Sequence, residues 1–242
     1  RGEVSEGMIC AEDELGLGKS HDGIMVLPED TKVGTLAKDY FKLETDYVYD
    51  IGLTPNRSDA TNHIGSARDL AAAMKVNHGY NGTLRMPEVN DFKIDSTDMS
   101  VEVVVENEEA CPRFSGVAIK NIEIKESPEW LKNRIEAIGV KSINNIVDIT
   151  NFVLHELGQP LHAYDFNAIK GKKVIVKTLP KDTIFKSLDE RDIKLRAEDL
   201  MICDGNTPLC IAGVFGGKGS GVSNQTKHIF LESAHFDAVS IR

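Results

Sequence analysis

Apolar residues recur at helical spacing in the first half of the chain. Between positions 61 and 75 they fall three or four residues apart, at Ile64, Ala67, Leu70, Ala71 and Met74. Because an α-helix has 3.6 residues per turn, this spacing gathers them on one face and predicts a helix. Thr61 is suited to cap its start, since a threonine hydroxyl can accept a hydrogen bond from a free backbone amide.

Two further helices are predicted near the middle of the chain. Ser127 and Pro128 form a start signal, with Ser127 as the cap and Pro128 at the first helical position, and Gly139 ends this helix. The next helix is expected from about Ser142 to Gly158, because apolar residues again recur at helical spacing. Pro160 prevents its continuation.

Runs rich in β-branched residues dominate the remainder and predict short strands. They span 114–124, 174–177, 183–185, 200–203, 209–215 and 228–231. Helices followed by a series of short strands are typical of the α+β class. We therefore expect a small N-terminal α+β piece, followed by a domain of helices packed on an antiparallel or mixed sheet.

A polar stretch at 85–100, which contains Pro87, is the best candidate for a linker. It divides the 242 residues into a partial structural module at 1–90 and a second domain at 101–242. Either part is long enough to bury a core. The chain starts at Arg1 and ends in an apolar-polar run, so we expect it to be a piece of a longer protein.

The net charge of −10 argues against binding DNA or RNA by charge alone, because phosphate neutralisation needs clustered lysine and arginine. The charge is uneven, with 10 basic and 22 acidic side chains in residues 1–110 and 18 basic and 16 acidic in residues 111–242. The second half holds a lysine group at positions 170, 172, 173, 177 and 181. This group is either a phosphate-facing edge or a solvated strand edge that discourages aggregation.

Cysteine usage and hydropathy favour a cytoplasmic protein. The four cysteines lack any Cys-x-x-Cys pair, which indicates reduced thiols rather than a disulfide framework. No apolar run approaches the roughly 18 to 20 residues that span a bilayer, so we expect no membrane association.

Several familiar catalytic motifs are incomplete. Residues 13–20 and 212–219 resemble phosphate-binding loops, but the first has Asp13 where a glycine belongs and the second ends in Gly219 where Ser or Thr would hold magnesium. The seven histidines show no zinc-binding spacing, and no serine lies in a nucleophile elbow. The sequence therefore predicts neither ATP binding nor a metal site in this chain.

Five segments in order along the chain resemble the beta subunits of bacterial phenylalanyl-tRNA synthetases. The longest, 144–165, reads NNIVDITNFVLHELGQPLHAYD, and the resemblance continues in IAGVFGG at 211–217 and LESAHFD at 231–237. Upstream, SEGMIC at 5–10 and LTPNRSD at 53–59 are similar to the part of that subunit before its editing module. The resemblance covers almost the whole chain.

This resemblance implies a site that hydrolyses tyrosine wrongly attached to tRNA(Phe). The residues that it assigns are Thr150 and Asn151 from the second of the two middle helices, His162 from the loop after it, and Ala212, Gly213 and Glu232 around the tyrosine side chain. A histidine can orient or deprotonate water near neutral pH. Without the resemblance, these residues also fit a structural histidine, a polar helix face, a tight strand bend and a solvent-facing glutamate.

The resemblance also implies partners for the whole synthetase. These are the acceptor end of tRNA(Phe) and the alpha subunit of a heterotetramer, with ATP and magnesium serving aminoacylation there and no cofactor in this fragment. In that family an oligonucleotide-binding fold would precede Arg1, and further modules would follow Arg242. Two alternatives stay open: a non-catalytic scaffold that binds tRNA or the alpha subunit, and a free-standing deacylase, which the resemblance of the first half disfavours.

Overall fold

A computed structural model describes residues 2, 4, 6–43, 46–205 and 207–242. The chain divides into two compact units, Arg1–Tyr49 and Asp50–Arg242. The first unit contains a short 3₁₀ helix, η1 (Asp13–Leu15), and a one-turn helix, α1 (Ala37–Tyr40). The described residues before Glu102 contain no strand, so the predicted α+β character of residues 1–90 is wrong there: the region has short helices, one longer helix and irregular segments.

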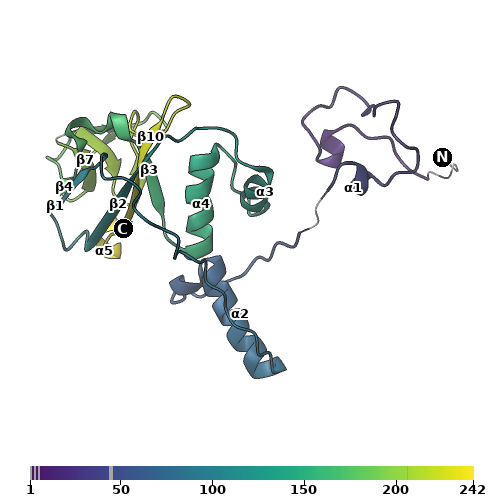
Figure 1. Cartoon of the computed structure of the whole chain (residues 1–242), viewed down its shortest axis with the longest axis horizontal. Helices are drawn as coiled ribbons and strands as arrows, with labels where there is room; N and C mark the ends of the chain where they lie inside the picture. Colours follow the sequence, from purple (N-terminus) through teal and green to yellow (C-terminus); the bar gives the residue numbers. More distant parts are fainter. Residues whose placement is uncertain (1, 3, 5, 44–45, 206) are drawn as a thin grey trace. The chain divides into compact units, whose positions relative to one another are not determined.

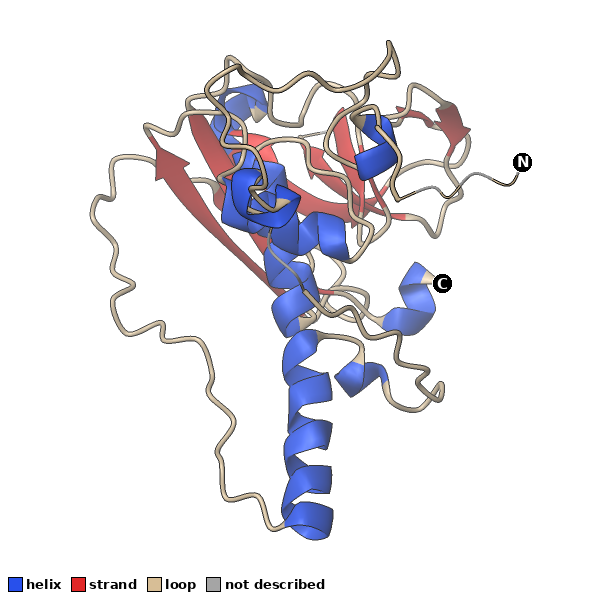
Figure 2. Ribbon diagram, turned by 90° about the vertical axis from the view of Figure 1, so that its right-hand side faces the viewer, coloured by secondary structure: helices blue, strands red, loops and turns tan. Residues whose placement is uncertain are grey.

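The predicted helix at 61–75 is confirmed as α2 (His63–His78), which follows the 3₁₀ helix η2 (Ser58–Ala60). Its cap is not Thr61 as expected but Asn62, whose side chain accepts from the Gly65 amide. Thr61 instead donates its hydroxyl to the Ser58 carbonyl at 2.7 Å, which takes that hydroxyl out of the capping position. Residues 79–100 then run as a loop from α2 back to the strands (Figure 2). The boundary at 91–100 stays a prediction.

The two middle helices are confirmed as α3 (Glu129–Ala137) and α4 (Asn145–Leu157), with corrected starts. Pro128 itself stands at the cap of α3, and Asn144 caps α4 through the Ile146 and Val147 amides. The two serines expected at these starts serve another purpose.

Both serines bind Asp148, a fully buried carboxylate on α4. Ser127 Oγ donates to Asp148 Oδ2 at 2.5 Å, Ser142 Oγ donates to the same oxygen at 2.6 Å, and the Ile143 amide donates to Oδ1 at 2.9 Å. A buried carboxylate is stable only when its oxygens are satisfied in this way. Asp148 therefore connects α4 both to Ser127, just before α3, and to Ser142 and Ile143 in the loop between α3 and α4.

In the part of the chain that the structure describes, ten strands form three sheets. The five-stranded sheet has the order β1-β4-β7-β8-β9, in which β1 (Glu102–Val105) pairs parallel with β4 (Lys173–Thr178) and every other pairing is antiparallel. Its remaining strands are β7 (Leu200–Asp204), β8 (Thr207–Ile211) and β9 (Phe215–Gly216). The run predicted as a single strand at 209–215 is thus two strands, because Gly213 turns the chain with a φ of 67°.

The second sheet is antiparallel, in the order β2-β10-β3, and a two-stranded sheet pairs β5 with β6. The bounds are β2 (Arg113–Lys120), β3 (Leu161–Asp165), β5 (Ile184–Lys186), β6 (Asp192–Lys194) and β10 (His228–His235). Short helices η3 (Phe166–Ala168), η4 (Lys170–Lys172) and α5 (Ala238–Ile241) complete the chain. The α+β class is confirmed, and so is the packing of helices on antiparallel and mixed sheets.

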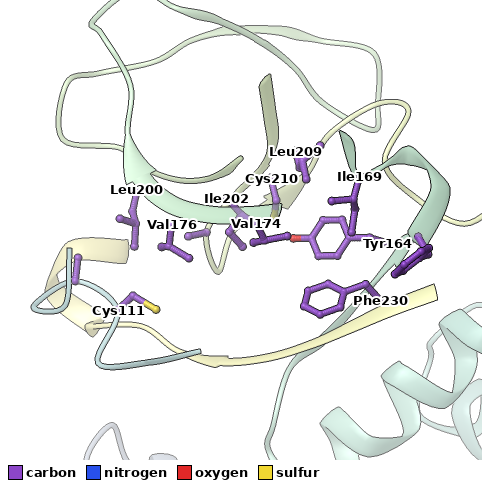
Figure 3. Close-up of a cluster of buried hydrophobic side chains, with 13 residues drawn as sticks. Cys111, Tyr164, Ile169, Val174, Val176, Leu200, Ile202, Leu209, Cys210 and Phe230 are labelled. Carbon is purple, nitrogen blue, oxygen red and sulfur yellow. The ribbon is translucent and has the colours of Figure 1, made fainter. Parts of the chain in front are cut away.

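The main core lies between the two larger sheets. Tyr164 and Phe230 from the three-stranded sheet pack in one cluster with Val174, Val176 and Ile202 from the five-stranded sheet (Figure 3). On its other side the three-stranded sheet carries α4, which packs against β3 (Figure 1). The three layers are therefore the five-stranded sheet, the three-stranded sheet and α4. Within the described residues, no helix is both long enough and apolar enough to span a membrane.

Candidate functional site

A cavity of about 210 Å³ opens at one end of the space between the two larger sheets. Its walls come from β3, from β8 and β9 with the turn between them, and from β10, and three of the predicted site residues line it: His162, Gly213 and Glu232. Pockets for drug-sized ligands usually measure roughly 300 to 1,000 Å³. The size therefore suits one amino-acid side chain.

His162 and Glu232 face this cavity because of the strand register. His162 lies in β3, not in a loop as predicted, and it is paired directly with Glu232 of β10. Since directly paired residues leave a sheet on the same face, both side chains point to the side where Tyr164 and Phe230 enter the core. The strand pairing thus brings together two residues that are 70 positions apart.

Glu232 is a buried acid at the cavity wall, with 6% of its surface exposed. The Tyr164 hydroxyl donates to Glu232 Oε2 at 2.7 Å. Burial raises the pKa of Glu232 to about 7, because charge is costly away from water, while the Tyr164 hydrogen bond acts in the opposite direction. Glu232 therefore changes its charge close to neutral pH.

His162 contributes a nitrogen that the protein itself does not satisfy. Its Nε2 is buried and has no hydrogen-bond partner among the described residues. The ring packs edge-to-face on Tyr164 with 4.4 Å between centroids. Burial lowers the pKa of His162, so the imidazole is neutral near pH 7 and one of its ring nitrogens can accept a proton.

The two small residues of the predicted subsite have different places. Gly213 lines the cavity, and its φ of 67° is a conformation that glycine adopts at little cost. Ala212 is fully buried in the core beside it, and its amide donates to the Leu200 carbonyl at 2.9 Å. Ala212 therefore supports the cavity wall from behind.

Thr150 and Asn151 are not brought to the cavity. Both lie on α4, which covers the opposite face of the three-stranded sheet, and neither is among the described residues that line the cavity. The Thr150 hydroxyl donates to the Val147 carbonyl at 2.7 Å, within its own helix. Their assignment to the site stays a prediction to which this geometry adds no support.

The sequence reasoning did not select three residues that shape the site. Tyr164 binds Glu232, Cys210 lines the cavity, and Gly216 leaves room for the imidazole, since a Cβ there would lie 3.0 Å from His162 Cε1. The alternation of His162 and Tyr164 in 161–165 was the available signal, because residues two apart in a strand share a face. The prediction placed this segment in a loop, so the alternation was not used.

The buried cysteines are poor nucleophiles in this setting. Burial raises the pKa of Cys210 to about 12 and that of Cys111 to about 11, and the nearby Glu232 carboxylate adds to both shifts. Thiols with such pKa values stay protonated at neutral pH. The described part of the chain also contains no group of three or more His, Cys, Asp or Glu side chains placed to hold a metal ion.

A second, larger hollow of about 560 Å³ lies elsewhere, at the ends of β1 and β4. Three glutamates line it, at positions 106, 108 and 109, together with Lys177. This excess of negative charge opposes the binding of a phosphate backbone. Two members of the lysine group are already engaged elsewhere, since Lys173 Nζ lies 2.9 Å from Glu102 Oε1 and Lys172 Nζ lies 4.2 Å above the Phe166 ring.

Comparison with known proteins gives a consistent result. Residues 110–242 match the B3/4 domain family. The chain is 53% identical over 242 residues to the phenylalanine–tRNA ligase beta subunit of Bacteroides fragilis, and 54% identical over 243 residues to that of Porphyromonas gingivalis. All of this chain is matched, but it spans only 29% of the length of either relative.

Among solved structures, the chain is similar to an N-terminal fragment of the phenylalanyl-tRNA synthetase beta-subunit from Pyrococcus horikoshii. The match has 14% sequence identity and a TM-score of 0.45, and it covers 76% of this chain and 54% of that chain. A similarity this distant supports no inference about the site.

Proposed function

The chain belongs to the B3/4 domain family and matches phenylalanine–tRNA ligase beta subunits over its whole length, and from this premise we propose that its second domain hydrolyses tyrosine wrongly attached to tRNA(Phe). The observation that carries the proposal is the cavity that His162, Gly213 and Glu232 share. A purely structural role does not require these three residues to share a cavity, so their convergence supports the proposal.

The ester bond of an aminoacyl-tRNA is already activated, so its hydrolysis needs a well-placed water more than a strong nucleophile. His162 is suited to this task, because it is neutral near pH 7 and its buried Nε2 has no partner among the described residues. In the proposed mechanism His162 orients the water and accepts its proton as the water attacks the carbonyl carbon. The proton then returns to the leaving ribose oxygen.

Glu232 is the proposed reader of the tyrosine hydroxyl. Phenylalanine is smaller than tyrosine, so a cavity that admits tyrosine cannot reject it by size. A buried acceptor that only the hydroxyl satisfies can reject it, because the carboxylate would otherwise lose water and gain no partner. The backbone amide of Gly213, in the same wall, is the proposed donor to the hydroxyl oxygen.

We also propose a role for the chain within a larger enzyme, by analogy with its relatives. The chain would belong to a cytoplasmic phenylalanine–tRNA ligase, receive the acceptor end of tRNA(Phe), and assemble with an alpha subunit. Aminoacylation, with its ATP and magnesium, would lie outside this chain, and no cofactor is proposed for the deacylation. A scaffold without catalysis remains the alternative, but no particular contact in the structure favours it.

The test is a deacylation assay with Tyr-tRNA(Phe) and Phe-tRNA(Phe) side by side, using the 242-residue chain and the full-length synthetase. We expect faster release of tyrosine than of phenylalanine, and loss of this activity in His162→Ala while tRNA binding persists. Equal release of both amino acids, or none by the full-length synthetase, would overturn the proposal. Unchanged activity in His162→Ala would show that His162 does not take part in the hydrolysis.

A further inference from the structure

Tyr164 links the two polar groups of the cavity. It is fully buried, its hydroxyl donates to Glu232 Oε2 at 2.7 Å, and its ring contacts the His162 ring at 4.4 Å between centroids. Figure 3 shows its ring beside Phe230 in the core. The phenol of Tyr164 is the same chemical group that the proposed substrate would present to Glu232.

We propose that Tyr164 is a positioning residue for specificity: it holds one carboxylate oxygen of Glu232 so that the other is left to accept the hydroxyl of a bound tyrosine. This inference rests on the proposed function and assigns a role that the resemblance did not include.

The hydrogen bonds of Glu232 divide its two oxygens. A carboxylate has two oxygens and roughly four acceptor positions. Oε2 receives the Tyr164 hydroxyl, whereas Oε1 receives no hydrogen bond from the part of the chain that the structure describes. Because Glu232 also lines the cavity, Oε1 is the oxygen available to a ligand there. Tyr164 fixes the carboxylate in one orientation without competing for that oxygen.

The Tyr164 hydroxyl also favours the charged form of Glu232. Burial raises the pKa of Glu232 to about 7, and the hydrogen bond from the Tyr164 hydroxyl lowers this pKa. The other titratable groups around Glu232 are His162 on β3, Cys210 on β8 and Cys111 before β2. Burial keeps all three uncharged near pH 7, so none of them supplies a positive charge.

The charged form is the one that discriminates. An ionised Glu232 accepts the substrate hydroxyl at Oε1, and that oxygen is left without a hydrogen-bond donor when phenylalanine occupies the cavity. A protonated Glu232 loses much less when the hydroxyl is missing, because a neutral group is cheaper to bury. The preference for tyrosine should therefore rise with pH through the Glu232 pKa.

The experiment is Tyr164→Phe, which removes one oxygen and keeps the ring. We measure deacylation of Tyr-tRNA(Phe) and Phe-tRNA(Phe) by the full-length synthetase from pH 5.5 to 9, and plot the ratio of the two efficiencies. The expected result is a midpoint about one pH unit higher than in the wild type, with a ratio at pH 7 that is several-fold lower and recovers at pH 9. An unchanged midpoint overturns the inference.

Two further measurements separate this role from a packing role. In a Glu232→Gln background, Tyr164→Phe should leave the pH profile unchanged, since no carboxylate remains to be tuned; a shift that persists there overturns the inference. Carboxyl NMR of the 242-residue chain should show the Glu232 pKa higher in Tyr164→Phe, and an equal or lower value overturns it as well.

The outcomes also distinguish this inference from the proposed function. If the wild-type synthetase hydrolyses neither ester, the proposed function fails and the specificity role fails with it. If the wild type prefers Tyr-tRNA(Phe) and Tyr164→Phe keeps both the preference and its pH profile, the proposed function stands and only the role of Tyr164 is overturned.

Discussion

His162 of β3 lies directly opposite Glu232 of β10, and both side chains reach the same cavity. In the proposed function one of them acts on the ester and the other reads the amino acid. Because the two side chains are a directly paired cross-strand pair and both contact Tyr164, the effects of substituting them can couple, so each variant needs a check of its fold.

His162→Ala should slow the hydrolysis of Tyr-tRNA(Phe) by about 10²- to 10⁴-fold, the usual contribution of a general base. Binding of tRNA should change little, because it depends on many phosphate contacts away from the cavity. Single-turnover deacylation and a filter-binding assay measure the two quantities. His235→Ala is the matched control, since His235 is an exposed histidine at the end of β10. Equal losses in rate and binding would indicate a structural histidine.

Glu232→Ala should lose most of the preference for Tyr-tRNA(Phe) over Phe-tRNA(Phe), chiefly through slower release of tyrosine. The loss corresponds to an unmet buried polar group, about 1 to 3 kcal/mol or roughly 5- to 150-fold. The ratio of the two deacylation efficiencies at pH 8 is the measurement. Circular dichroism checks that the variant is folded. A folded variant with an unchanged ratio would show that Glu232 does not read the hydroxyl.

The raised pKa of Glu232 also predicts how stability depends on pH. Its pKa is about 7 in the folded chain against an ordinary 4.5, so the folded state binds the proton more tightly than the unfolded state does. The stability linked to this proton is fully present below pH 4.5 and is lost as the pH rises to 7. Glu232→Gln has no proton to lose, and glutamine can still accept from Tyr164.

The free energy of unfolding of Glu232→Gln, relative to the wild type, should therefore increase by up to about 3 kcal/mol between pH 4 and pH 8. Urea unfolding at pH 4, 6 and 8 measures this difference, and groups that titrate in both proteins cancel. A difference that stays flat across this range would place the Glu232 pKa near its ordinary value.

Gly213→Ala should both destabilise the chain and slow deacylation. The left-handed φ of 67° costs a residue with a side chain about 1 to 2 kcal/mol, and the new Cβ would lie 3.2 Å from Phe236 Cδ2. Gly139→Ala is the matched control, because Gly139 has a φ of 81° but no heavy atom within 4 Å of its Cβ position. Thermal unfolding and deacylation of both variants separate the two effects. If Gly213→Ala and Gly139→Ala lose equal stability and both keep their deacylation rate, Gly213 has no role in the site.

The helices and most strands could be predicted from the sequence because their patterns are local. The helix at 61–75 is confirmed as α2, although its predicted apolar face is only partly buried and Leu70 is 63% exposed. The strand at 174–177 is confirmed as β4, in which Val174 and Val176 are buried. Helix starts were less accurate. Ser127 and Ser142 have the chemistry of caps, but buried Asp148 accepts from both hydroxyls, and the Ser127 contact spans 21 positions of the sequence.

The site could be predicted only in part. The resemblance selected His162, Gly213 and Glu232, which the structure brings to one cavity. It could not show that Tyr164 holds Glu232, because that bond depends on the pairing of β3 with β10. Strand register is set by contacts between distant segments, so periodicity within one segment does not reveal it.

The parallel pairing of β1 with β4 shows that the folded domain begins upstream of the matched B3/4 region. The family match begins at residue 110, but β1, at Glu102–Val105, forms the outer strand beside β4. A chain shortened to residue 110 would lose β1 and leave the β4 edge unpaired, with its amides and carbonyls open to other chains. Unpaired edges of this kind promote aggregation. Soluble expression of the domain should therefore require a start before Val101, ten or more residues upstream of the family match.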